Sequence, residues 1–489
     1  MPTPLERRSE SSRLLDSALS HSALATELFV HNEKNFESLY QRLANEIPRQ
    51  AHRYAAAEFL RQSLIEVEKA ADHLPERPED LLAWMETNVE SVHQQYQDYL
   101  QGRKRGGGRR YFSNYAHALY VLRHIAPTKL VDGAWLYGLC AHKSNQRLSD
   151  LVTTYVEELG GGAEDKNHVK LYRELLARYG LDPIDGLDDE LYHQGLIQLA
   201  LGWNADEFFP EIVGFNLAYE QLPLHLLITA YELNELGVDP YYFTLHVTVD
   251  NADTGHAKRA CVAALEAAPR IDDGGEYWRR VRAGAKLGDL GVSTLEVIKN
   301  FNIEEEVIRI FKRKAPAGHG AHSNFCKVDG RNINDWLSDP EELPDFVAAL
   351  ERTGWIKKDQ PVSSSRFWGI LQGERAEMYG VFSPYELQVI HDWIRGSASA
   401  DGLPYQAESI SVSSTRQLSF RVAERLKALQ GSRPVADTAS LDVDLETFKK
   451  RFPHLDPSAQ FELLVQAMAP AMHWTPAGLL ATQLFVKTP

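Results

Sequence analysis

Cysteine is scarce in this sequence of 489 residues. Its three cysteines, Cys140, Cys261 and Cys326, are odd in number and far apart, so we expect buried thiols in a reducing compartment rather than a disulfide framework. Long apolar runs are lacking too: none approaches the length of a membrane-spanning helix, and the residues after Met1 lack the apolar core of a signal peptide. These shortages predict a cytoplasmic protein without a membrane partner.

Basic charge is also in short supply. The 52 lysines and arginines stand against 68 aspartates and glutamates, and the resulting net charge of −16 would repel nucleic-acid phosphates. One basic cluster exists, in residues 103–110, but its glycines lack the Gly-Lys-Ser/Thr ending of a phosphate-binding P-loop. We therefore expect a solvated linker there and no nucleic-acid partner.

Apolar residues recur at three- and four-residue spacing along most of the chain, whereas strand-like alternation is nearly absent. Such spacing, interrupted by Gly/Pro/Asp turns, predicts an all-α bundle whose sites lie between inward helix faces. We expect five parts: an N-terminal helical segment (1–105), a helical core (106–315), an accessory helical segment (316–395), a linker (396–440) and a C-terminal helical tail (441–489). Core helices are predicted over residues 111–124, 130–142, 151–158, 168–179, 190–201, 211–221, 224–236 and 241–268.

The stretch 241–257 carries metal-ligating residue types at helical spacing. His246, Asp250 and Asp253 would share one face of a helix, and His256 would be rotated by roughly 80° from His246. A polar stripe on an apolar helix is costly to bury unless a metal or hydrogen bonds satisfy it. A solvent-facing stripe paired with lysines explains the same pattern equally well.

Two upstream stretches add further ligand types. Glu158 and His168 lie ten residues apart, at the end of one predicted helix and the start of the next. Glu220 places a single carboxylate inside an apolar helical run, where an unpaired charge is strongly disfavoured. Taken singly, each has an ordinary explanation: an exposed residue near a helix end, a helix-start histidine, or a salt bridge.

Taken together, the order of these residues resembles the haem-oxygenase-like diiron oxidase superfamily (iron-containing redox enzyme family), whose members bind no haem and hold iron inside a helical bundle. In that family one helix provides a Glu and a later His, a second provides a Glu, and a third provides His-x-x-x-Asp/Glu-x-x-His. The resemblance covers about residues 110–270 and implies a haem-oxygenase-like bundle with helical extensions at both ends. It also implies the metal ligands Glu158, His168, Glu220, His246, Asp250 and His256.

The sixth ligand departs from the family pattern. Asp253 stands where the family has histidine, and the nearest imidazole, His256, follows three residues later. We expect His256 to be the ligand, because Gly255 gives the chain local freedom and a nitrogen ligand keeps the set at three carboxylates and three imidazoles. Asp253 remains the alternative.

The function that the resemblance implies is that of a non-haem diiron oxidase or oxygenase, with two Fe(II) ions and O2 as co-substrate. Mixed imidazole and carboxylate ligands suit Fe(II) that binds dioxygen. The substrate would be a small organic molecule, such as an amine, an amino acid or a fatty acid, and no catalytic residue beyond the metal ligands is expected. One iron in place of two stays open, and the chain could form a homodimer.

Three other interpretations compete with this one. The chain could be a non-catalytic helical ligand-binding or scaffold protein with a vestigial metal site. It could degrade haem, although six clustered ligands favour iron held directly by side chains. Finally, His319, His322 and Cys326 could form part of a zinc site or a lid, but without a second cysteine pair an ordinary loop is expected.

Overall fold

The structure, a computed structural model, describes residues 35–181, 186–221, 223–249, 255–271, 274–372, 376–396 and 442–488. It consists almost entirely of helices, which confirms the predicted all-α class. Within these residues the only sheet is an antiparallel pair of two-residue strands, β1 (Lys327–Val328) and β2 (Arg331–Asn332). No helix in the described ranges is long and apolar enough to cross a membrane.

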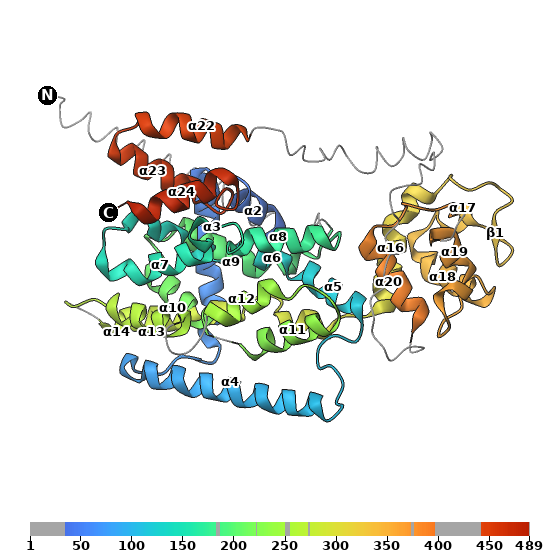
Figure 1. Cartoon of the computed structure of the whole chain (residues 1–489), viewed down its shortest axis with the longest axis horizontal. Helices are drawn as coiled ribbons and strands as arrows, with labels where there is room; N and C mark the ends of the chain where they lie inside the picture. Colours follow the sequence, from blue (N-terminus) through green and yellow to red (C-terminus); the bar gives the residue numbers. More distant parts are fainter. Residues whose placement is uncertain are drawn as a thin grey trace.

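The larger body of the molecule combines helices from both ends of the sequence (Figure 1). Its first helices are α2 (Phe36–Ala44), α3 (Gln50–Glu66) and α4 (Leu81–Lys104). Its central helices are α5 (Tyr115–His124), α6 (Ala126–Lys129), α7 (Ser149–Glu158), α8 (His168–Arg178), α9 (His193–Trp203), α10 (Phe209–Tyr219), α11 (Leu224–Glu235), α12 (Tyr241–Val249), α13 (His256–Glu266), α14 (Gly274–Lys286) and α15 (Thr294–Lys299). The last helices, α22 (Val443–Arg451), α23 (Pro457–Ala467) and α24 (Pro476–Lys487), lie along its upper side in Figure 1.

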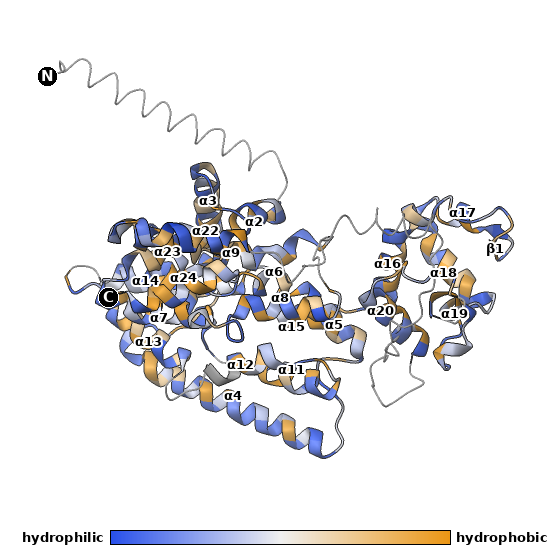
Figure 2. Cartoon of the chain, turned by 45° about the horizontal axis from the view of Figure 1, so that its top comes forward, coloured by the Kyte–Doolittle hydropathy of each residue, from blue (hydrophilic) through white to orange (hydrophobic). Residues whose placement is uncertain are grey.

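A smaller body lies at the other end of the long axis in Figure 1. It contains the two strands and α16 (Ile303–Gly318), α17 (Ile333–Trp336), α18 (Leu343–Arg352), α19 (Arg366–Gln372) and α20 (Pro384–Arg395). Helix α20 packs against α5, so an apolar core continues from the smaller body into the larger one. Figure 2 shows hydrophobic residues gathered where helices face each other, whereas α4 is mostly hydrophilic and buries only Leu81, Met85 and Val89.

Helices α10 and α14 cross with their backbones in contact. A Cβ atom on Gly214 would lie 1.8 Å from the carbonyl oxygen of Val281, and one on Gly284 would lie 2.1 Å from that of Glu211. Both distances are far below van der Waals contact, so the crossing admits no side chain at either position. The crossing fixes the position of α10, whose C-terminal end leads into Glu220.

The C-terminal helices are held against the turn between α7 and α8. This turn contains the 3₁₀ segment η5 (Gly160–Gly162). The Gln483 side chain donates a hydrogen bond to the Gly162 carbonyl (2.9 Å), and the Tyr155 hydroxyl donates one to the carbonyl of Met468 (2.6 Å). The predicted C-terminal tail is therefore packed onto the helical core.

Two predicted core helices and one predicted thiol environment are wrong in detail. Helix α6 ends at Lys129, Gly133 adopts φ +79° in the turn that follows, and the next residues form the 3₁₀ segment η3 (Ala134–His142) instead of an α-helix over 130–142. Within the expected helix over 241–268, the described residues form two helices, α12 and α13, and the extended Gly255 caps the N-terminus of α13. Cys140 and Cys261 are buried as expected, but Cys326 is exposed. The expected linker 396–440 lies outside the described residues, except for Gly396.

The buried side chain of His117 joins α5 to α15. Its Nδ1 accepts a hydrogen bond from the Ser113 backbone N–H (3.2 Å), and its Nε2 donates one to the Ile298 carbonyl (2.8 Å). This pair of bonds requires the neutral imidazole. Burial lowers the pKa of His117 to about 4, and the bond to Ile298 opposes that shift only in part.

We expect the free energy of unfolding to fall on acidification because of His117. Its folded pKa, about 4, lies below the usual value of 6.5, so between these values the unfolded chain binds more protons. The contribution is complete above pH 6.5 and is lost as the pH falls toward 4. Replacing His117 with Gln should flatten the dependence of stability on pH in this window, by up to about 1.4 kcal/mol per pH unit. Unfolding measured in denaturant at several pH values checks this; parallel curves for both proteins would contradict it.

Candidate metal centre

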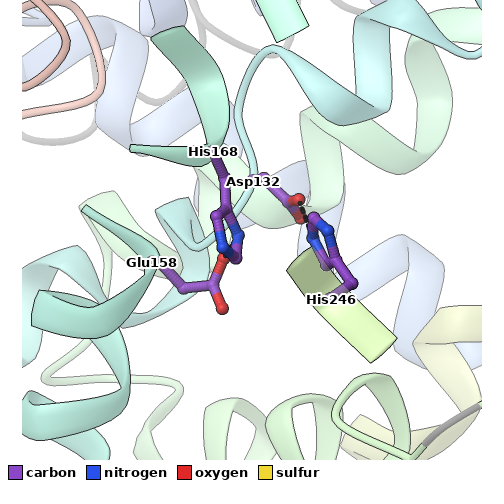
Figure 3. Close-up of side chains that lie close together, drawn as sticks. All are labelled: Asp132, Glu158, His168 and His246. Atoms are coloured by element: carbon purple, nitrogen blue, oxygen red, sulfur yellow. Dashed lines mark hydrogen bonds and ion pairs between the residues drawn. The ribbon is translucent and has the colours of Figure 1, made fainter. Parts of the chain in front are cut away.

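Four buried side chains from four parts of the bundle converge in the larger body (Figure 3). Glu158 ends α7, His168 begins α8, Asp132 lies in the turn between α6 and η3, and His246 lies on α12. One potential ligand atom from each lies within 4.8 Å of those of the others. We call these four residues the first cluster.

Gly133 brings the Asp132 turn close to α7. A Cβ atom on Gly133 would lie 2.9 Å from Cβ of Glu158, and the positive φ of this residue is one that side chains disfavour. A glycine at position 133 is therefore needed both for the backbone conformation of the turn and for its close contact with α7. This local geometry lets the carboxylates of Asp132 and Glu158 enter the same cluster.

One nitrogen of His246 is held by the backbone, and the other faces Asp132 in the first cluster. Its Nδ1 lies 2.8 Å from the carbonyl oxygen of Tyr242, to which it must donate. In the neutral ring Nε2 then carries a lone pair, yet it faces Oδ2 of Asp132 at 3.1 Å. The Tyr242 hydroxyl donates to the same Oδ2 (2.7 Å). Two electron-pair donors that face each other in this way suit a cation bound between them.

The side chains of His168 and Glu158 also lie in contact within the first cluster. Nδ1 of His168 lies 2.5 Å from Oε2 of Glu158, but this buried nitrogen has no partner in hydrogen-bond geometry. Burial lowers the pKa of His168 to about 4, so its ring is neutral at pH 7. A neutral imidazole is the form that binds metal ions.

A second cluster shares Glu158 with the first and adds Glu220 and His256. Glu220 caps the C-terminal end of α10, and His256 is the first residue of α13. Nδ1 of His256 lies 2.9 Å from Oε2 of Glu220 and 3.5 Å from Oε1 of Glu158. The other carboxylate oxygen of Glu220 is buried without a hydrogen-bond partner.

The site concentrates negative charge away from water. Burial, with the charges of Asp132 and Glu220, raises the pKa of Glu158 to about 8. Burial alone would lower the pKa of His256, but Glu220 and Glu157 outweigh it and raise that pKa to about 11. Burial likewise opposes ionisation of Asp132, but its pKa lies well below the usual value, and the charge of Lys129 is the largest lowering cause. Bound cations would relieve the repulsion among the carboxylates of Asp132, Glu158 and Glu220.

The donor set fits iron. It offers imidazole nitrogens and carboxylate oxygens and no thiolate, as non-haem Fe(II) sites do. The unpartnered buried atoms, Nδ1 of His168 and one oxygen of Glu220, are groups that a metal would satisfy. Both clusters are therefore chemically suited to hold a divalent ion, and Glu158 could contact an ion in either.

The structure brings together five of the six expected ligands: Glu158, His168, Glu220, His246 and His256. Asp250, the sixth, and its neighbour Asp253 lie outside the described residues. His319, His322 and Cys326 join no group of three metal-ligating side chains among the residues that the structure describes.

Asp132 belongs to the site and was not predicted from the sequence. Its signal is the Asp132-Gly133 pair, which is typical of a turn and here interrupts an apolar run. A predicted helix over 130–142 concealed that turn. Lys129, three residues earlier, is likewise a charged residue within the same run.

The fold and the site together define a class: an all-α bundle with buried carboxylate and histidine side chains arranged to bind metal ions between its helices. Residues 119–289, about a third of the chain, match the model of a family described as iron-containing redox enzyme. This segment contains all members of both clusters. The match confirms the relationship to haem-oxygenase-like iron enzymes that the ligand order predicts, and it supports an iron-dependent oxidoreductase. No curated protein and no solved structure matches the chain.

Proposed function

We propose that this protein is a non-haem diiron oxidase or oxygenase that uses O2 to oxidise a small organic molecule. The observation that carries the proposal is the sharing of Glu158 between two buried clusters, each with carboxylate and imidazole donors. A shared carboxylate is suited to contact two ions at once. Iron bound here would supply the electrons that reduce dioxygen.

The chain's own residues would hold the two ions in different surroundings. Asp132, His168 and His246 would bind one ion, Glu220 and His256 the other, and Glu158 both. Tyr242 would keep Asp132 oriented through its hydroxyl, and the Tyr242 carbonyl would keep Nε2 of His246 available. His256 would have to lose its proton to Glu157 or to solvent before it could bind an ion.

A cavity of about 250 Å³ adjoins this site and provides a place for the substrate. Asp132, Glu158, Glu220 and His246 form part of its wall. Trp135 also lines it and is held by a hydrogen bond from its Nε1 to Asn216 (3.0 Å). The aromatic and aliphatic side chains in the cavity wall would limit the access of water to the iron.

The direct test is anaerobic loading with Fe(II), followed by removal of unbound iron and metal analysis. We expect two irons per chain, and consumption of O2 when air is admitted with amines, amino acids or fatty acids as candidate substrates. Less than one iron per chain, combined with no change in His246→Ala, would refute the proposal. If the wild type and the variant each held one iron per chain, the site would be limited to a single ion.

Variants of the two clusters should separate the two ions. Asp132→Asn should weaken the ion of the first cluster and His256→Ala that of the second, so each should reduce the iron content from two per chain to about one. Iron titrations followed by metal analysis measure this. If both variants lost the same ion, or if His256→Ala kept both, the assignment of two ions to two clusters would be wrong.

A further inference from the structure

The cavity beside the metal centre has a second wall that carries none of the proposed ligands. This wall comes from the end of α6, the start of α9, the end of α10 with the start of α11, and the segment that leads into α15. Its polar residues are Thr128, Lys129, Gln194, Tyr219, Gln221, His225, Ser293 and Thr294. At about 250 Å³ the cavity lies below the range of roughly 300–1,000 Å³ found for pockets that hold drug-sized ligands. It therefore suits a short molecule.

Among the described residues that line this cavity, Lys129 is the only lysine or arginine. Its side chain is 8% exposed, and its ammonium lies 5.6 Å from the centre of the Tyr219 ring. Among the described residues, no carboxylate lies within 4.0 Å of that ammonium. A buried cation is costly without an anionic partner close by.

The charge of Lys129 is maintained by its neighbours. Burial alone would lower the pKa of this lysine, but Tyr219, Asp132 and Glu158 raise it above the usual value. Asp132 and Glu158 are also proposed metal ligands. When they neutralise bound cations, they can no longer balance the lysine, and the cavity gains a positive charge that an anion of the substrate would compensate.

We propose that Lys129 binds the carboxylate of the substrate, so that the molecule oxidised here is a short carboxylic acid or amino acid. This inference rests on the proposed function, which it narrows by excluding simple amines and long-chain fatty acids. A carboxylate is favoured over a phosphate because the wall offers one cation, whereas a dianion would require further positive charge. The hydroxyl groups of Ser293 and Thr294 are available as additional donors.

The test compares acids with their uncharged amides. Protein loaded anaerobically with Fe(II) is titrated calorimetrically, without O2, with hexanoate and hexanamide, benzoate and benzamide, and L-norleucine and L-norleucinamide. We expect at least one acid to bind at least about tenfold more tightly than its amide, because the ion pair with Lys129 is lost in the amide. Lys129→Met should abolish this preference, and Lys129→Arg should keep part of it.

Lys286→Met is the matched control. Lys286 is as buried as Lys129, but its ammonium pairs with Asp72 (3.0 Å) and it does not line the cavity. This control should keep both the iron and the acid preference. Iron content and thermal stability are measured for every variant; if Lys129→Met does not fold, Lys129→Gln takes its place.

The outcomes separate the two proposals. A low iron content of the wild type refutes the proposed function. Normal iron content with no acid preference, or with no binding of any of the three acids at millimolar concentration, refutes the role of Lys129. A preference that persists in Lys129→Met also refutes it, because the acids then bind to iron directly.

Discussion

Glu158→Gln is expected to remove both irons, which no other single substitution among the described ligands should do. Glu158 is the one residue common to the two clusters, and an amide is a far weaker ligand than a carboxylate. Iron affinity should fall by at least about 100-fold. Loss of a residue that only hydrogen-bonds to a metal ligand lowers metal affinity by about 10–100-fold, and loss of a ligand should lower it further. Metal analysis after anaerobic loading should therefore find close to no iron per chain.

The control for this experiment is Glu306→Gln. Glu306 is also buried, but it lies on α16 in the smaller body, where it accepts a hydrogen bond from Tyr385 (3.0 Å). This variant should keep its full iron content even if it is less stable. If the Glu158→Gln variant retained one iron, the remaining ligands of one cluster would be sufficient to bind an ion without Glu158, which would contradict this prediction.

The largest loss of stability is expected for Gly214→Ala at the crossing of α10 and α14. The added Cβ would overlap the Val281 carbonyl, a backbone atom that cannot rotate away, so the two helices must separate. We expect a loss of about 3 kcal/mol in the free energy of unfolding, and a decrease in Tm of about 3 °C for a chain of this length. Differential scanning calorimetry measures both.

The same substitution should also affect the metal centre. Because Glu220 caps α10, a displaced helix moves this carboxylate away from His256, and the ion of the second cluster should be lost first. Gly369→Ala is the matched control: Gly369 lies within α19, and an added Cβ there would meet no atom within 4 Å. It should be at least as stable as the wild type, because alanine favours helices over glycine. Equal stability of Gly214→Ala and Gly369→Ala would contradict the close crossing.

Periodicity predicted the central helices well because each of them buries one face. The helices predicted over 151–158, 168–179 and 224–236 match α7, α8 and α11 to within two residues at either end. Periodicity failed where backbone conformation decides the structure. Gly133 and Gly255 both have non-helical backbone conformations and stand before the next helical segment, and a count of apolar residues does not register that.

The candidate site was predicted largely through the order of its ligand types, and the residues that depend on tertiary contacts were missed. Asp132 enters the site only because Gly133 permits close contact with α7. The pKa values of Lys129 and Asp132 depend on their burial and on each other's charge, and neither can be read from the order of residues in the sequence. The packing of α24 on η5 joins residues more than 300 positions apart, beyond the range of any local signal.

The contacts of the C-terminal helices impose an order on the maturation of this protein. The turn that sets Glu158 opposite His168 is held by Gln483, and the helix that ends at Glu158 is held by the Met468 carbonyl. During synthesis, every proposed ligand leaves the ribosome some 200 residues before α24 does. The nascent chain would thus present its carboxylates and imidazoles to the metals of the cell before the turn that spaces them has been fixed, so the choice of metal should be settled only after α24 has been synthesised.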